Sequence, residues 1–255
     1  MYIVGHVITA VCSGVIEPGQ ICDDGVFALM LPDYLNCHDW GYDNCFARSA
    51  DALDRLLINT HLLGDWYVHF GADVRERKRV GWAYRRMGVY ARLYEEFFTR
   101  ATHLNLRDEG EYADSVRGFS HTMMEYSVDT FLARRGDFEP FFVPVKTALQ
   151  RLNKKEGPGS AEWVERTIEQ QGIVTEEASL SEIESFRSRV EQSSNAEEFA
   201  LRAGVKKFRL KNCEESIHFL RTYIDEGLAV ITESELLELI NNTADFIGTW
   251  AVGSA

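Results

Sequence analysis

Three side chains that could bind metal recur every four residues in the segment HLLGDWYVH: His61, Asp65 and His69. On an α-helix of 3.6 residues per turn, a step of four residues rotates the side chain by only about 40°, so the three would share one face. Imidazole nitrogens and carboxylate oxygens are usual ligands of zinc and related divalent metals. A carboxylate between two histidines can also bridge two ions. We therefore expect Asp65 at the centre of a polynuclear site.

A polar stripe on an exposed helix is the main alternative interpretation of this spacing, because short motifs specify chemistry only loosely. The stripe, however, continues the face of Leu53 and Leu57. An unpaired charge would be costly to bury on such a face, so we favour metal binding.

A second pair with the same spacing, His121 and Glu125, lies in HTMMEYSVD. Alone, it would be an ordinary contact on a helix surface, worth a few tenths (about 0.2–0.5) of a kcal/mol. Its neighbours Met123 and Met124 are apolar, however. Two helices with matching pairs are better explained by one shared site than by two coincidences.

Further candidates stand upstream: His6 lies in an apolar segment, and Asp33 follows FALMLP and precedes His38. Alone, His6 would be a core histidine and Asp33 a turn residue, but beside the downstream pairs both become ligand candidates. Asp33 and Asp65 are the predicted catalytic carboxylates. The predicted metal ligands are His6, Asp33, His38, His61, Asp65, His69, His121 and Glu125.

One known family shows a similar succession of residues. His6, Pro32-Asp33, His38, HxxxDxxxH at 61–69 and HxxxE at 121–125 together resemble the zinc-dependent phospholipase C family, over roughly residues 1–135. That family, with its S1/P1-nuclease relatives, is all-helical and holds up to three zinc ions with His, Asp and Glu.

The resemblance implies that His61, Asp65 and His69 are central ligands, that His121 and Glu125 complete one metal, and that His6 and Asp33 complete another. The secreted members also bind one zinc through an amino-terminal Trp. This chain begins Met-Tyr, and we expect no leader to be removed.

The activity implied is that of a zinc-dependent phosphodiesterase, a phospholipase C-like hydrolase acting on a small anionic or phosphoester substrate. Two or three zinc ions would neutralise the phosphate oxygens and lower the pKa of a bound water from about 15.7 towards about 7. Asp33 could orient or deprotonate that water. Iron and manganese are the alternative metals.

Two other functions stay open. HD-domain proteins, which include phosphohydrolases and iron oxygenases, bind two metals with an isolated His, a His-Asp dyad and a later Asp, and His6, His38-Asp39 and Asp129 follow that order. The segment CHDWGYDN looks like a loop, however, whereas the dyad normally lies on a helix. The other function is that of a non-catalytic helical binding protein, with VRERKRVGWAYRR at 74–86 as a partner-binding face or, as we favour, a charged surface helix.

Helices are expected to position these residues: over 2–16, from Ser49 through the metal stripe, across the eighties and nineties, and from about Ser115 to Arg135, closed by Gly136. Residues 22–45 show no sustained period and predict a loop. Short strands could form at 173–175 and 228–232. We predict an all-α, multi-helix metal-binding bundle over residues 1–152, followed after a linker at 153–160 by a helical C-terminal region, 160–255, that could pack on it as one unit.

The composition limits the partners and the setting. A net charge of −13 and a pI near 5.0 disfavour non-specific binding to nucleic acid or anionic membranes. Five cysteines without a CxxC pair suit a reducing compartment, and no apolar run approaches the roughly 18 residues of a membrane span. We expect a cytoplasmic protein, either monomeric or a homodimer.

Overall fold

The computed structural model describes residues 3–21, 25–44, 53–101, 116–151, 160–174 and 180–252. Every regular element within these ranges is a helix, which confirms the all-α prediction. The first half contains α1 (Ile3–Cys12), α2 (Pro18–Gln20), α3 (Val26–Leu29), α4 (Leu31–Leu35), α5 (His38–Asn44), α6 (Leu53–Phe70), α7 (Trp82–Arg86), α8 (Gly88–Ala91), α9 (Tyr94–Ala101) and α10 (Val116–Arg135). The rest contains α11 (Glu139–Arg151), α12 (Ala161–Gln171), α13 (Leu180–Gln192), α14 (Ala196–Lys207), α15 (Glu214–Leu228) and α16 (Glu233–Val252).

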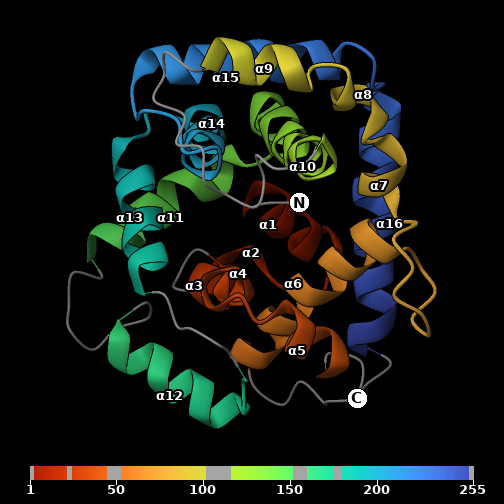
Figure 1. The fold of residues 1–255 in the computed structure, drawn as a ribbon. Coiled ribbons are helices and arrows are strands. Elements are labelled where there is room, and N and C mark those ends of the chain that lie inside the picture. The colour runs from red at the N-terminus through yellow and green to blue at the C-terminus, as the bar shows by residue number, and fades with distance from the viewer. Residues whose placement is uncertain are drawn as a thin grey trace.

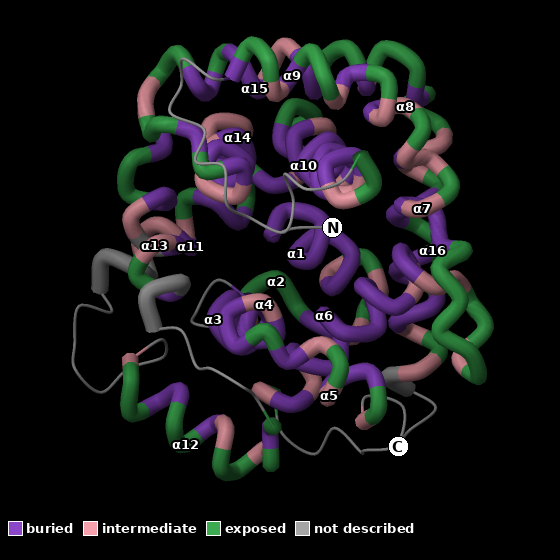
Figure 2. Tube along the Cα trace, in the orientation of Figure 1, coloured by how far each residue is buried: buried purple, intermediate pink, exposed green. Residues whose placement is uncertain are grey.

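Helix α1 lies in the middle of the molecule, with α10 and α14 on one side and α3 to α6 on the other (Figure 1). It contacts both long helices that carry candidate ligands, α6 and α10. Its residues Ile3 to Ala10 are all buried, as Figure 2 shows. An apolar helix surrounded on all sides is expected to be hydrophobic around its whole circumference, and IVGHVITA has one strongly polar residue, His6.

The C-terminal helices pack directly on the first half of the chain. Helix α14 contacts α10, and α16 contacts both α6 and α1. One hydrophobic core contains Val7 and Leu57 from the first half together with Leu220 and Ile247 from the second. A Cβ at Gly64 would lie 3.6 Å from both His6 Nδ1 and Ile247 Cδ1, so α16 lies directly behind the stripe on α6.

Residues 25–44, where the sequence predicts a loop, form the three short helices α3, α4 and α5, so that prediction is wrong. Each is too short to display a helical period in the sequence. Pro32 falls in the first turn of α4, where its missing N–H costs no hydrogen bond. Asn36 then ends α4 in the left-handed conformation, with φ +48°. The turn residues of this segment therefore mark helix ends.

The two predicted strands are not formed by the residues that the structure describes there. Residues 173–174 follow α12 as irregular chain, and residue 175 lies outside the described ranges. Residues 229–232 connect α15 to α16, and Ile231 is buried against helices instead of pairing in a sheet. Gly136, by contrast, follows α10 with φ +80°, as expected of a glycine C-cap. No described helix has the length and apolar character needed to cross a membrane.

Candidate metal centre

All eight predicted ligands lie on helices that meet around α1. The stripe of His61, Asp65 and His69 lies on α6, and each of four other helices contributes one or two residues around it. The ligands are His6 from α1, Asp33 from α4, His38 from α5, His61, Asp65 and His69 from α6, and His121 and Glu125 from α10. The spacing of four residues does place the stripe on one side of α6, because all three of its members contact other members of the set.

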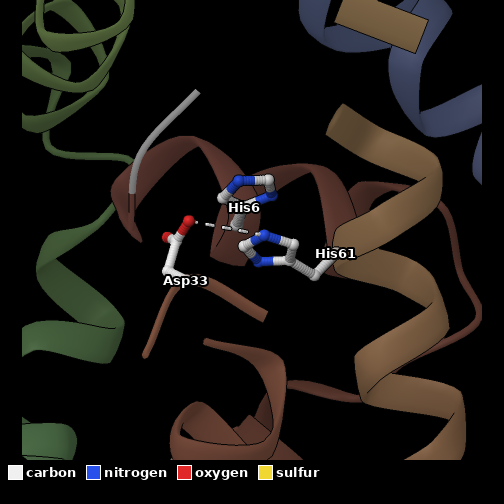
Figure 3. A group of neighbouring side chains, drawn as sticks. All are labelled: His6, Asp33 and His61. Atoms are coloured by element: carbon white, nitrogen blue, oxygen red, sulfur yellow. Dashed lines mark ion pairs between the residues drawn. The ribbon is translucent and has the colours of Figure 1, made fainter. Parts of the chain in front are cut away.

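Within this set, three groups each bring three donor atoms within 4.8 Å of one another. The groups are His6, Asp33 and His61; His38, His61 and Asp65; and His69, His121 and Glu125. Figure 3 shows the first group, with the imidazoles of His6 and His61 stacked and Asp33 directed at His61. The two ring centroids are 3.8 Å apart, with an angle of 15° between the planes.

The donor atoms have spacings suited to a shared metal ion. His38 Nε2 lies 3.4 Å from Asp33 Oδ1 and 3.3 Å from His61 Nε2, and His61 Nε2 lies 3.8 Å from Asp33 Oδ1. Ligands placed tetrahedrally about 2.0–2.2 Å from a zinc ion lie about 3.3–3.6 Å from each other. The observed donor distances fall in or near that range, so little movement is needed to bind an ion.

Asp65 connects the histidines of the stripe to the upstream ligands. Its Oδ1 lies 3.2 Å from His6 Nε2, and its Oδ2 lies 3.2 Å from His38 Nε2 and 3.9 Å from His61 Nε2. The two carboxylate oxygens therefore face different imidazoles. This is the arrangement required of a carboxylate that bridges two ions.

The third group lies one turn further along α6. Glu125 Oε1 is 3.4 Å from His69 Nε2 and 3.8 Å from His121 Nε2, and the two imidazole centroids are 4.8 Å apart. The ligands come from both α6 and α10, as the matching spacings of the two segments predict.

Burial is deepest at the stacked imidazoles of His6 and His61 and decreases towards Asp33 and His38. His6 and His61 are 1% and 0% exposed, whereas the side chains of Asp33 and His38 retain about a quarter of their exposure (25% and 24%). Among the described residues, several buried polar atoms have no hydrogen-bond partner: His6 Nδ1, Asp33 Oδ2, His61 Nδ1 and His121 Nε2. Leaving such atoms unsatisfied is costly. A bound cation would satisfy those that face the cluster.

The electrostatics keep most of these groups in the form that binds metal. Burial, together with the neighbouring His6, lowers the pKa of His61 to about 3, and burial lowers the pKa of His121 to about 4. Both imidazoles are therefore neutral at pH 7. Burial opposes the ionisation of Asp65, but the surrounding histidines outweigh it and hold its pKa well below the ordinary value. For His38, hydrogen bonds to Asp33 and Asp65 outweigh burial and raise the pKa to about 10, so a metal would displace a proton there.

The HD-type arrangement is not assembled. Although His38-Asp39 lies on a helix, α5, and not on the predicted loop, the side chain of Asp39 is 98% exposed and pairs with Arg77. Asp129 is buried, and its two oxygens accept the N–H groups of Val4 and Gly5 at 2.9 and 3.0 Å. It therefore caps the amino terminus of α1, the helix that carries His6.

Two tyrosines beside the ligands were not predicted from the sequence. Tyr42 donates to Asp65 Oδ2 at 3.5 Å, and Tyr84 stacks on His121 with ring centroids 5.3 Å apart and planes 22° apart. Neither shows a spacing that links it to the stripe. Their contacts arise only from the packing of α5 and α7 against α6 and α10.

Comparison with known proteins finds no match: no family model, no curated protein and no solved structure matches this chain. The resemblance to the zinc-dependent phospholipase C family therefore stays a prediction.

Proposed function

We propose that this protein is a metal-dependent hydrolase of phosphoesters, with phospholipase C-like chemistry at a centre of two or three zinc ions. One observation carries the proposal: eight imidazole and carboxylate side chains, from five helices, converge in three adjoining groups at metal-ligand distances. His61 belongs to two of these groups, and an imidazole nitrogen offers one lone pair. The two groups that share His61 would therefore hold one or two ions between them. The group of His69, His121 and Glu125 would hold another.

The roles of the residues follow from their positions. Bound zinc ions would neutralise the phosphate oxygens and acidify the attacking water. Asp65 positions the imidazoles of His6 and His38, because each of its two carboxylate oxygens contacts one of them. Asp33 lies at a more exposed edge with Oδ1 near His38 and His61, while Oδ2 has no described hydrogen-bond partner and is left to accept the proton of water.

A non-catalytic polar network explains the site less well. Buried networks are stable when each polar atom has its partner, and here three imidazole nitrogens and one carboxylate oxygen lack one among the described residues. The HD-type alternative is also disfavoured, because Asp39 is directed away from the cluster.

Metal content is the first test. Purified protein should contain two or three equivalents of metal by elemental analysis, and zinc, iron and manganese are to be measured together. His61→Ala and His121→Ala should each lose about one equivalent or more, whereas His218→Ala, which removes an exposed histidine, should lose none. Less than one equivalent in the wild type, unchanged by the two substitutions, contradicts the metal centre.

Activity is the second test. The zinc-loaded protein should hydrolyse at least one member of a panel of phosphodiesters and phosphomonoesters, and a chelator should abolish the activity. His61→Ala should reduce the rate by at least about a hundredfold, as expected when a metal that stabilises the transition state is lost. A fully metallated protein that is inactive on the whole panel contradicts hydrolysis while leaving metal binding intact.

A further inference from the structure

The aromatic ring of Tyr84 packs beside the group of His69, His121 and Glu125. It stacks on His121, and its centroid lies 6.0 Å from that of His69. Tyr84 is held there by α7, which contacts both α6 and α10 (Figure 1). Gly81, just before α7, donates its N–H to the carbonyl oxygen of His69 at 2.9 Å. The position of the tyrosine is therefore tied to the end of the ligand stripe.

Two arginines converge on this tyrosine from different parts of the chain. The guanidinium carbon of Arg117 lies 4.9 Å from the Tyr84 centroid, and that of Arg79 lies 5.6 Å from it. Arg117 stands one turn before His121 on α10, whereas Arg79 lies in the connection between α6 and α7. Both residues are exposed. A guanidinium held near an aromatic ring keeps its N–H groups available for a ligand.

These two arginines differ from their neighbours in lacking an acidic partner among the described residues. In the same connection, Arg75 pairs with Asp73 and Lys78 pairs with Glu76. Arg77 reaches across to α5, where it pairs with Asp39 and Asp43.

The same contrast holds on α10. Arg134 pairs with Glu197 and Asp225, and Arg135 pairs with Asp137 and Glu233. The chain carries 40 acidic and 27 basic residues. Two cations that contact one aromatic ring and lack an acidic partner among the described residues, in a protein of net charge −13, make a local positive site beside a candidate metal group.

We propose that Arg79, Tyr84 and Arg117 form an anion clamp that binds a dianionic phosphate group next to the metals. This deepens the proposed function, on which it rests: among phosphoesters, the substrate class narrows to those with a terminal dianionic phosphate, namely monoesters and diesters that carry a second phosphate, and diesters without such a group are disfavoured. The planar guanidinium groups match phosphate oxygens in pairs. Ions held by His69, His121 and Glu125 would supply further positive charge nearby.

The test is phosphate binding, which does not require turnover. The protein, incubated with zinc, is titrated with inorganic phosphate at pH 8 and low salt by calorimetry. Arg79→Gln and Arg117→Gln should each weaken binding about threefold or more, and the double variant about tenfold or more, because exposed charge pairs contribute modestly one at a time. Arg75→Gln removes an exposed charge from the same connection and should stay within about twofold of the wild type. Added salt should weaken binding in the wild type more than in the double variant.

A second arm uses two competitors, methyl phosphate as the dianion and dimethyl phosphate as the monoanion. The double variant should lose more affinity for the dianion than for the monoanion, while its metal content stays that of the wild type. The clamp is overturned if the double variant binds phosphate as the wild type does, if the loss is equal for both competitors, or if the wild type binds no phosphate. Hydrolysis is scored separately, so a protein that shows the predicted phosphate binding without turnover contradicts the hydrolase and leaves the clamp standing.

Discussion

At the scale of the residue, Asp65 is the side chain on which the candidate centre depends most. It lies within 3.2 Å of both His6 and His38, and its ionised form is favoured by the imidazoles around it. Replacement by asparagine keeps the shape but removes the charge that would balance two cations. The loss of metal should therefore affect more than one of the three groups of candidate ligands.

We predict that Asp65→Asn lowers the metal content of the purified protein by at least about one equivalent, measured by elemental analysis. Asp39→Asn is the matched control, because it makes the same chemical change at an exposed residue next to a ligand. Its metal content should equal that of the wild type. Unchanged metal content in Asp65→Asn would contradict the assignment of Asp65, and metal loss in Asp39→Asn would favour the HD-type alternative.

The candidate ligands on α6 and α10 were predictable because their spacing is local. Four residues on a helix return a side chain to the same face, so HxxxDxxxH and HxxxE predict which groups point together before the fold is known. Tyr84 and Arg79 gave no such signal. The contacts of Arg79 with Tyr84 and of Tyr84 with His121 depend on the path of residues 71–81 back onto the end of α6, which is a tertiary contact.

At the scale of the element, the amino terminus of α1 is positioned by a carboxylate from α10. The first N–H groups of a helix have no partner within it. Here the carboxylate of Asp129 accepts those of Val4 and Gly5, next to His6. The cap thus sets the position of a ligand without itself being one.

We predict that Asp129→Ala destabilises the protein by about 2–4 kcal/mol, because two buried N–H groups lose their acceptor, and that it lowers metal content as His6 loses its position. Denaturant unfolding and elemental analysis measure the two effects. Asn195→Ala, which removes the cap of α14, should cost about 1 kcal/mol and leave the metal unchanged. If Asp129→Ala does not yield folded protein, Asp129→Asn keeps one acceptor and should show a smaller loss of both. Unchanged stability and metal content in Asp129→Asn and Asp129→Ala would contradict the role of the cap.

The long helices α6 and α10 were predictable from periodicity, whereas α3, α4 and α5 were not. Residues 25–44 change direction at Asn36 and are divided among three helices of four to seven residues, so no stretch is long enough to establish a period. The candidate ligands Asp33 and His38 nevertheless come from two of these short helices. Gly41 brings α5 against α6, since a Cβ there would lie 2.4 Å from Leu62 Cδ2. Such a close approach is decided by packing and leaves little trace in the spacing of residues.

At the scale of the whole molecule, the candidate centre joins five helices in one place. The ligands extend from His6 to Glu125, and the helices that carry them share one core with the C-terminal region. A ligand that binds only the folded state stabilises it by mass action. Metal should therefore act on the unfolding of the whole chain, and not only on the local region.

We predict that zinc raises the midpoint of thermal unfolding, relative to chelator-treated protein, by about 8–16 °C for each ion bound. Each ion present at about a thousand times its dissociation constant contributes about 4 kcal/mol, and about 2–4 °C per kcal/mol is typical of a chain of this size. Scanning calorimetry measures the midpoint. The double variant His61→Ala, His121→Ala should show no more than a small shift on adding zinc. A wild-type midpoint that is indifferent to zinc and chelator would contradict this prediction.

The packing of α16 behind α6 and α1 also bears on the order of events during synthesis. All eight candidate ligands have been translated once residue 125 is made, yet the helix that contacts α1 and α6 from behind begins only at Glu233. A nascent chain that already contains all eight candidate ligands therefore still lacks α16, the helix against which α1 and α6 pack. We expect the ions to be acquired late, after α16 has docked.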